Sequence, residues 1–408
     1  MSPAKLAAGP IAGLERRHVV KGLAAATAGL ALPGCAPGPT YHGDPATPGS
    51  VAKVESLGGH ADFVLRTLIW YAKLPTPVPI STGVDLYRIS YWSTTGGRPV
   101  LVSGLMGAPQ RGQPRATVLW MHGTNTGRSD SISKPSLEGV TAAAVFGGGG
   151  YLTLAPDLLG LGVSHATQAY FYNPSTIAVT LDFLKAARQV AADLGKPWRP
   201  QLCIAGFSQG GHSTAVIQRE LERRNDPAWQ VKAAAGIAGS YNLADVGFPF
   251  AIQGKSAEDT IYLGLLAISY ATYYGHPLES LLAPAALPLM RRLLDGDHMA
   301  EQATQTPANP RSIFTPQFLA DFDAGRSNWF IEAMRENQAY DWAPKAPFRA
   351  YEGDKDVDVP PADSRQFVAG ARQRGGAAEL IDVGPYDHSG TAFHAAPQIR
   401  AWFDSLSV

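Results

Sequence analysis

The sequence has few of the features that mark nucleic-acid-binding, membrane-spanning or disordered proteins. Among its 408 residues, 34 Lys and Arg balance 34 Asp and Glu, and no basic cluster lies beside interleaved aromatics. Nucleic acids and other polyanions are therefore not expected partners. Beyond the N-terminal region, no run is long and apolar enough to cross a bilayer. The charged fraction is only 17%, whereas Gly (43) and Pro (32) are abundant, which is typical of a globular enzyme with many tight turns.

Cysteine is scarce, and a phosphate-binding loop is missing. Of the two cysteines, Cys203 lies in the apolar run 202–205, where a thiol behaves as a small hydrophobic side chain of a buried strand. The glycine run at 147–150 is not followed by Lys and Ser or Thr, and it connects a predicted helix to a strand rather than a strand to a helix. The sequence therefore indicates no cofactor, and the chemistry inferred below requires no metal.

The N-terminal region has the pattern of an export signal. A basic segment that contains Arg16 and Arg17 precedes a short, mildly apolar run at 22–34. The paired arginines, followed by an apolar pair and Lys21, resemble the twin-arginine signal. The sequence Leu-Pro-Gly-Cys that ends at Cys35 resembles a bacterial lipobox, although Pro33 is uncommon there. Acylation of Cys35 is the interpretation we favour, and an ordinary cleavage site nearby is the alternative.

These patterns predict where the mature protein begins and where it is located. We expect an export signal at 1–35 and a flexible tether at 36–55, in a region rich in Pro, Gly, Ser and Thr. The mature protein is then periplasmic or a cell-envelope lipoprotein, or alternatively secreted. Acylation of Cys35 would anchor it to a membrane.

The mature chain has the alternating pattern of an α/β protein. From about residue 84 onward, short β-type runs alternate with helical patterns, which favours a mostly parallel sheet with helices on both faces. We expect eight strands, centred on residues 84–92, 100–106, 116–121, 151–155, 201–205, 234–238, 348–351 and 378–381.

One interval interrupts this alternation. Between the sixth and seventh predicted strands, about one hundred residues carry helical patterns but no strand pattern. We therefore predict a core formed by 56–242 and 346–408, and a helical cap at 243–345. The predicted helices at 261–274 and 278–294 are unusually apolar, so they could cover an acyl-binding cleft or bury these faces against each other.

The sharpest motif is a G-x-S-x-G pattern centred on Ser208. It occupies 206–210 and lies between a predicted strand and a predicted helix. A serine at such a sharp turn is held in a strained backbone geometry that exposes its hydroxyl, and the start of the helix favours negative charge beside it. We therefore predict that Ser208 is a nucleophile.

A serine nucleophile needs a base and an orienting carboxylate, and both follow later in the chain. The loop after the seventh strand offers Asp356, which stands three residues after a glycine and four before a proline; Asp358 and then Asp354 are the alternatives. The loop after the eighth strand offers His388 as the base, and His394 is its rival. The remaining histidines precede the acid along the chain, whereas this type of site follows the order Ser, acid, His.

The attack on a carbonyl group creates an oxyanion, which backbone N–H groups can stabilise. One donor should be the N–H of Gln209, the residue after the nucleophile. We assign the second to the N–H of Thr124, in the loop after the third strand, where Gly123 allows the turn.

Several segments resemble one known family. They are the segments 120–124, 155–162, 206–212 and 340–344. Together they resemble the secretory lipase family and its bacterial α/β-hydrolase relatives, over most of residues 80–405. The resemblance implies the α/β-hydrolase fold, a helical cap between strands six and seven, and lipase or esterase activity. Asp157, with Gly160 and Gly162, matches a turn that shapes the pocket floor in such proteins, although a purely structural turn is the interpretation we favour.

The sequence also departs from the usual pattern of the family. Asp387 adjoins the predicted base, and two further aspartates flank Asp356, so the identity of the acid stays open. With these residues, we expect hydrolysis of a small-molecule or lipid carboxylic ester through an acyl-enzyme. The alternatives are a serine peptidase of the same fold and a lipid-anchored binding protein without turnover.

The lipobox leads to a first testable prediction. Cys35→Ala removes the thiol that would carry the acyl chain, so the variant should move from the membrane fraction to the soluble fraction. Cell fractionation followed by immunoblotting measures this distribution. An unchanged distribution would exclude anchoring through Cys35.

Overall fold

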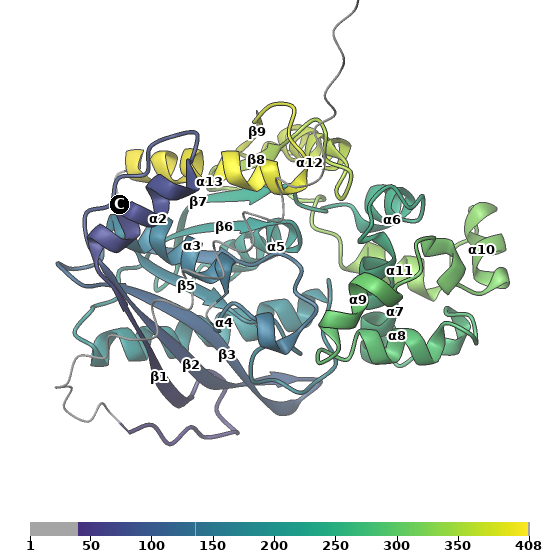
Figure 1. The fold of residues 1–408 in the computed structure, drawn as a ribbon, viewed down its shortest axis with the longest axis horizontal. Helices are drawn as coiled ribbons and strands as arrows, with labels where there is room; N and C mark the ends of the chain where they lie inside the picture. Colours follow the sequence, from purple (N-terminus) through teal and green to yellow (C-terminus); the bar gives the residue numbers. More distant parts are fainter. Residues whose placement is uncertain (1–39, 135, 407–408) are drawn as a thin grey trace, which may run out of the picture. The chain divides into compact units, whose positions relative to one another are not determined.

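Nine strands form one mixed sheet in the computed structural model, which describes residues 40–134 and 136–406 (Figure 1). The predicted export signal, with Cys35, lies outside the described residues. The strand order is β1-β2-β3-β5-β4-β6-β7-β8-β9. The strands are β1 (Val51–His60), β2 (Val84–Thr95), β3 (Arg98–Pro109), β4 (Thr117–Met121), β5 (Leu152–Pro156), β6 (Gln201–Phe207), β7 (Gln230–Ile237), β8 (Phe348–Glu352) and β9 (Ala378–Asp382).

The sheet has an antiparallel part and a parallel part. β1, β2 and β3 are antiparallel, and β3 pairs antiparallel with β5. β5, β4, β6, β7, β8 and β9 run parallel to one another. Gly96 and Gly97, both with positive φ, form the two-residue turn between β2 and β3. The carboxyl ends of the parallel strands therefore share one edge, where the loops that carry the predicted site residues begin.

The prediction of eight strands was wrong by one, because β1 was not expected. Its segment has no continuous apolar run and contains two adjacent glycines, and most of its side chains are at least partly exposed. Such a pattern is common in an edge strand, where only one neighbour and one face provide contacts. Residues 51–55 of the predicted tether belong to this strand rather than to a flexible linker. The other eight strands correspond to those predicted.

Helices cover both faces of the sheet. On one face, the apolar core includes side chains of α4 (Asn173–Asp193), α5 (Gln209–Arg224) and α12 (Pro361–Gln373). On the other face, it includes side chains of α2 (Asp62–Ala72), α3 (Leu137–Phe146) and α13 (His388–Ser405). A sheet covered on both sides explains the nearly continuous apolar sequences of β4 to β7.

The interval between β7 and β8 is helical and has an apolar cluster of its own (Figure 1). Its helices are α6 (Phe248–Ala251), α7 (Asp259–Tyr274), α8 (Leu287–Leu293), α9 (Met299–Gln305), α10 (Pro316–Asp323) and α11 (Trp329–Glu336). The ring of Phe248 lies 5.1–6.0 Å from four phenylalanine rings of this cluster. We call this interval, residues 243–345, the cap. Within the described residues, no helix of the core or the cap has the length and hydropathy needed to cross a bilayer.

The helix that begins after Ser208 packs unusually close to the sheet. Gly210 lies in the first turn of α5, and a Cβ atom at this position would overlap the backbone carbonyl of Met121, at the end of β4. Backbone atoms cannot rotate out of the way as a side chain can. Glycine at 210 therefore sets the distance between α5 and the carboxyl edge of the sheet.

This close approach predicts a large cost for a small substitution. Gly210→Ala should lower the free energy of unfolding by about 3 kcal/mol, because the added methyl group must push α5 away from β4. Denaturant titration measures the change. The matched control is Gly370→Ala in α12, where a Cβ would lie 3.2 Å from the flexible end of Arg374 and at ordinary contact distance from the carbonyl of Tyr340. That variant should gain about 0.5–1 kcal/mol from helix propensity. Equal stabilities of the two variants would contradict this account.

Candidate active site

Ser208 occupies a strained turn between β6 and α5. Its φ and ψ are 57° and −117°, so it is one of five non-glycine residues with positive φ in the described chain. Its N–H donates to the carbonyl of Ile237 on the neighbouring β7 at 2.8 Å, which fixes the turn. Such a conformation costs about 1–3 kcal/mol and persists only where the surroundings impose it. Here the close packing of α5 imposes it.

Asp356 and His388 form a hydrogen-bonded pair. The ring Nδ1 of His388, at the start of α13, lies 2.7 Å from Oδ2 of Asp356, in the loop after β8. The other carboxylate oxygen of Asp356 accepts from the backbone N–H groups of Asp358 and Val359, each at 2.9 Å. Because a carboxylate only accepts, Nδ1 must donate, and Nε2 is the acceptor of the neutral ring.

A phenylalanine connects this pair to the turn at Ser208. The ring centroid of Phe207, the residue before Ser208, lies 4.6 Å from that of His388. A Cβ at Gly123 would lie 3.1 Å from the same phenylalanine ring, on the loop predicted to stabilise an oxyanion. The Nε2 atom of His388 is buried and has no hydrogen-bond partner among the residues that the structure describes, which leaves it free to accept a proton. The structure thus brings the loops of the predicted nucleophile, base, acid and oxyanion donors to one edge of the sheet.

The other candidate acids have different partners. The carboxylate of Asp358 accepts a hydrogen bond from Ser256 of the cap at 2.7 Å. Asp354 forms an ion pair with Arg365. The rival base His394 stacks on Tyr386, with ring centroids 3.7 Å apart. Geometry therefore favours Asp356 and His388 over the alternatives that the sequence left open.

A metal ion could in principle use the same carboxylates. One potential ligand atom from each of Asp356, Asp358 and His388 lies within 4.8 Å of the others. Each group already has a protein partner, since Asp356 and His388 bind each other and Asp358 accepts from Ser256. The arrangement is explained by hydrogen bonding alone.

One predicted oxyanion donor lies at the start of a helix, and the other lies in a loop. Gln209 is the first residue of α5, so its N–H has no partner within the helix. The side chain of Thr124 makes a 3.0 Å hydrogen bond with the hydroxyl of Tyr170. Its neighbour Gly123 donates its N–H to the carboxylate of Glu138 at 3.1 Å. The loop is therefore anchored on both sides of the backbone N–H that we assign to the site.

Glu138 is a site residue that the sequence analysis missed. Its carboxylate also accepts from the indole N–H of Trp120 at 2.8 Å, and burial raises the pKa of Glu138. Ser136 caps the helix by accepting from the N–H of Gly139. The sequence signal was therefore a capping serine followed by an acidic residue in the first helical turn, which predicts the start of a helix and not a contact with a distant loop.

Two histidines near the site have structural roles. His122 is buried; its Nε2 accepts from the N–H of Leu158, and its Nδ1 lies 2.6 Å from the carbonyl of Gly123. His212 on α5 is also buried, and its Nδ1 lies 2.7 Å from the carbonyl of Ser240. Burial lowers the pKa of His212 to about 3, so this ring is not suited to accept a proton at neutral pH. Both rings hold loops at the carboxyl edge in place.

The turn that begins at Asp157 is held by hydrogen bonds within the core. The Asp157 carboxylate is fully buried and accepts from the hydroxyl of Ser103 and the N–H of Ser133. Burial raises its pKa. Gly160 and Gly162 both have positive φ in this turn. These contacts support the structural role that we favoured for Asp157.

A cavity lies between this turn and the cap. It has a volume of about 570 Å³, and its lining includes neither Ser208 nor His388. Its walls combine polar and apolar groups. The charged or titratable lining residues are Arg128, His165, His276, Glu279, Arg291 and Asp295. The apolar faces of α7 and α8, which could have covered an acyl chain, instead pack into the interior of the cap.

Known proteins are similar to this chain in structure rather than in sequence. No protein-family model matches the sequence, and no curated protein matches it. A Legionella pneumophila protein described as a candidate hydrolase superimposes with a TM-score of 0.81 at 24% identity, over 88% of this chain and 99% of its own. The rice cell wall degrading esterase LipA from Xanthomonas oryzae superimposes with a TM-score of 0.77 at 23% identity, over 88% of this chain and 98% of its own. Candida antarctica lipase A in its closed state superimposes with a TM-score of 0.64 at 14% identity, over 87% of this chain and 83% of its own.

These similarities establish the fold. The chain has the α/β-hydrolase fold, a mixed sheet flanked by helices, and the predicted fold class is confirmed. At these identities, the neighbours do not transfer an activity or a substrate.

The pairing of His388 leads to a prediction that does not depend on activity. A histidine Nδ1–H bonded to a carboxylate gives a strongly downfield proton resonance in NMR spectra. Asp356→Asn should remove or strongly shift this resonance, whereas the matched variants Asp354→Asn and Asp358→Asn should keep it. If Asp358→Asn alone removed the signal, Asp358 would be the partner of His388 in solution.

Proposed function

We propose that this protein is a serine hydrolase that cleaves carboxylic esters, with Ser208 as nucleophile, His388 as general base and Asp356 as orienting acid. The proposal depends above all on one observation. His388 is bound to Asp356 through Nδ1, while its buried and unpartnered Nε2 lies on the ring that contacts Phe207, next to Ser208. The fold supports the proposal, because proteins of similar structure include an esterase and a lipase.

The proposed reaction has two steps. Nε2 of His388 accepts the proton of the Ser208 hydroxyl as the oxygen attacks the ester carbonyl, and the Asp356 carboxylate stabilises the resulting imidazolium. The backbone N–H groups of Gln209 and Thr124 stabilise the oxyanion. The imidazolium then protonates the leaving alcohol. A water molecule, deprotonated by the same histidine, hydrolyses the acyl-enzyme and restores the serine.

The surroundings of the site favour a compact or polar ester over a long acyl chain. Ser208 and His388 are each only 8% exposed, so a substrate must be small or must displace part of the cap. Polar groups lie beside the loops of the site. The hydroxyl of Tyr170 bonds to Thr124, and the carboxylate of Asp358 accepts from the hydroxyl of Ser256. The apolar side chains of the described cap pack mainly against one another.

Variants of two serines test the proposal directly. A panel of chromogenic esters of increasing chain length is hydrolysed by the wild type and by each variant. Ser208→Ala should lower kcat by about 10⁴-fold or more, because no nucleophile remains to form the acyl-enzyme. Ser213→Ala, which changes another buried serine of α5, should stay within about threefold of the wild type.

The same panel distinguishes the alternatives. The wild-type rates should fall from acetate toward long-chain esters. Equal ester hydrolysis by Ser208→Ala and the wild type would exclude Ser208 from the mechanism. Cleavage of aminoacyl or prolyl substrates without ester cleavage would identify a peptidase, and no turnover of any substrate would favour a binding protein.

A further inference from the structure

Helix α2 has an apolar stripe on each of two opposite sides. Leu65 is buried, and Leu68 and Ile69 pack against the same apolar cluster as Leu65, so this stripe attaches the helix to the core. Phe63 and Trp70 have the spacing i, i+7 of a second stripe and are 68% and 77% exposed.

This second stripe is unusual for the surface of this protein. Tyr71, on the same helix, is 49% exposed. These three aromatic side chains are half of the large hydrophobic side chains that are exposed in the described chain, and they lie within nine residues of one another. A second apolar stripe on a helix that is already attached to a core indicates a surface that binds something.

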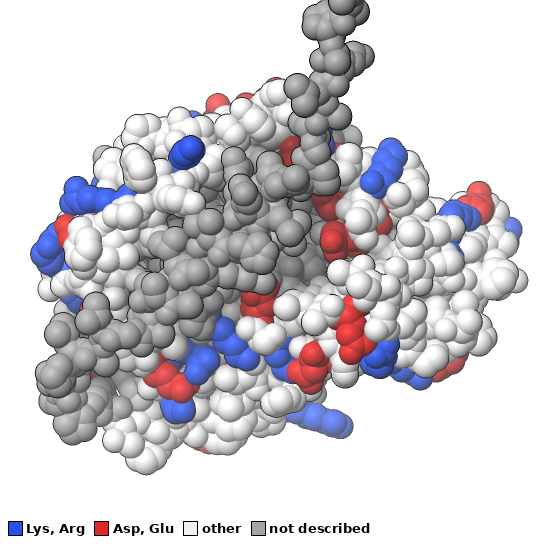
Figure 2. Space-filling model, viewed as in Figure 1, with Lys and Arg blue, Asp and Glu red and all other residues white. Residues whose placement is uncertain are grey.

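The chemistry of this stripe matches a lipid–water interface. Trp and Tyr are enriched at the headgroup level of membranes, where one end of the ring is apolar and the other is wet. Arg66 and Lys73 lie on or at the end of the same helix and are exposed. Asp62, the one carboxylate of α2, is bound by Arg66 at 3.2 Å and by Arg111 at 2.9 Å. Arg66, Lys73 and Arg111 thus provide three cations beside the single carboxylate of Asp62. Figure 2 shows basic side chains along the edge of the molecule near α2.

The position of α2 also fits an anchored protein. His60, directly before α2, pairs with Val84, and Val84 pairs with Pro109 at the end of β3. Since β3 is antiparallel to β5, α2 lies at the amino edge of the parallel strands, opposite the edge of Ser208 (Figure 1).

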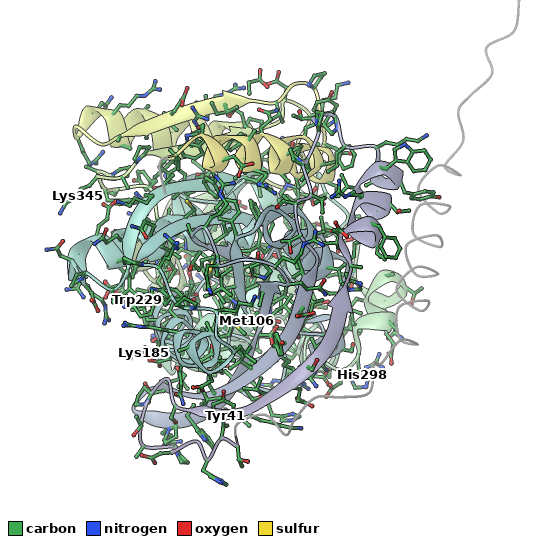
Figure 3. The ribbon with its side chains drawn as sticks, turned by 90° about the vertical axis from the view of Figure 1, so that its left-hand side faces the viewer. Tyr41, Met106, Lys185, Trp229, His298 and Lys345 are labelled. Carbon is green, nitrogen blue, oxygen red and sulfur yellow. The ribbon has the colours of Figure 1, made fainter. Side chains whose placement is uncertain are left out.

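The beginning of the described chain reaches the same edge. Tyr41 donates to Asp193, the last residue of α4, just before the strand β6 begins. Figure 3 looks onto this side of the molecule and labels Tyr41, with Trp229 and Lys345, which precede β7 and β8. The described chain therefore begins at the edge of the sheet that α2 also occupies.

We propose that α2 binds the surface of an anionic lipid bilayer through Phe63, Trp70 and Tyr71, as a second membrane contact beside the expected acyl group. Cations of α2 interact with anionic headgroups at short range. The Ser208 edge lies at the other end of the strands, so it faces away from the bilayer that α2 binds, and the substrate comes from the aqueous phase rather than from that bilayer.

The test uses the full chain without its acylation site. Purified Cys35→Ala protein is mixed with sonicated vesicles of phosphatidylglycerol and phosphatidylcholine, or of phosphatidylcholine alone, and co-sedimentation gives the partition coefficient. On this background, the triple variant Phe63→Ser, Trp70→Ser and Tyr71→Ser should bind about 100-fold less. Arg66→Gln with Lys73→Gln should bind about tenfold less to the anionic vesicles only, and the difference should shrink at high salt.

Two controls separate membrane binding from other effects. Leu137→Ser changes a hydrophobic residue that is 61% exposed at the start of α3, outside the proposed surface, and should bind as the parent does. Thermal unfolding of the triple variant should match that of the parent, because the three side chains are exposed.

Three outcomes would overturn the proposal. The first is a Cys35→Ala protein that binds neither type of vesicle, and the second is a triple variant that binds as well as its parent. The third is a parent that forms dimers which the triple variant loses, without a change in vesicle binding. In that case α2 would contact a second copy of the chain.

Discussion

The close contact between α5 and the carboxyl ends of the central strands determines the geometry of the site. Because Gly210 has no side chain, the helix can begin directly above β4, and the chain must turn sharply at Ser208 to reach it. The turn then places Phe207 under the ring of His388 and beside Gly123. One backbone contact therefore fixes the relative positions of three loops that are far apart in the sequence, and the strain at Ser208 is part of that arrangement.

The loop after β8 has two functions within a few residues. Through Asp356 and its backbone donors at Asp358 and Val359, it orients His388. Through the carboxylate of Asp358, it binds Ser256 of the cap. The loop of Thr124 has a similar double attachment, since Thr126 donates to Gln302 of the cap. Core and cap are thus joined at the segments that would contact a bound substrate.

Much of this fold was predictable, because its strongest signals are local. Eight strands were found from their apolar runs, and the turn at Ser208 from five consecutive residues between a strand and a helix. The edge strand β1 was missed because an exposed strand has no such run. Choosing between Asp354, Asp356 and Asp358 required the direction of each side chain, which spacing alone does not contain. Glu138 could not be found either, since its contact with Gly123 depends on how α3 packs on the sheet. The apolar faces of the cap were recognised, but only their packing shows that they pair with each other.

The edge strand has a practical consequence for defining the folded unit. β1 supplies the hydrogen-bonding partner of β2 along most of its length, from Val51 opposite Tyr91 to His60 opposite Val84. A recombinant version trimmed to residue 56, where the core was first expected to start, would leave half of this ladder unpaired. Exposed main-chain donors and acceptors on β2 could then recruit strands from neighbouring molecules, a common origin of insoluble material. The residues from Val51 onward are thus part of the fold, and removing them would expose a strand edge that can pair with other molecules.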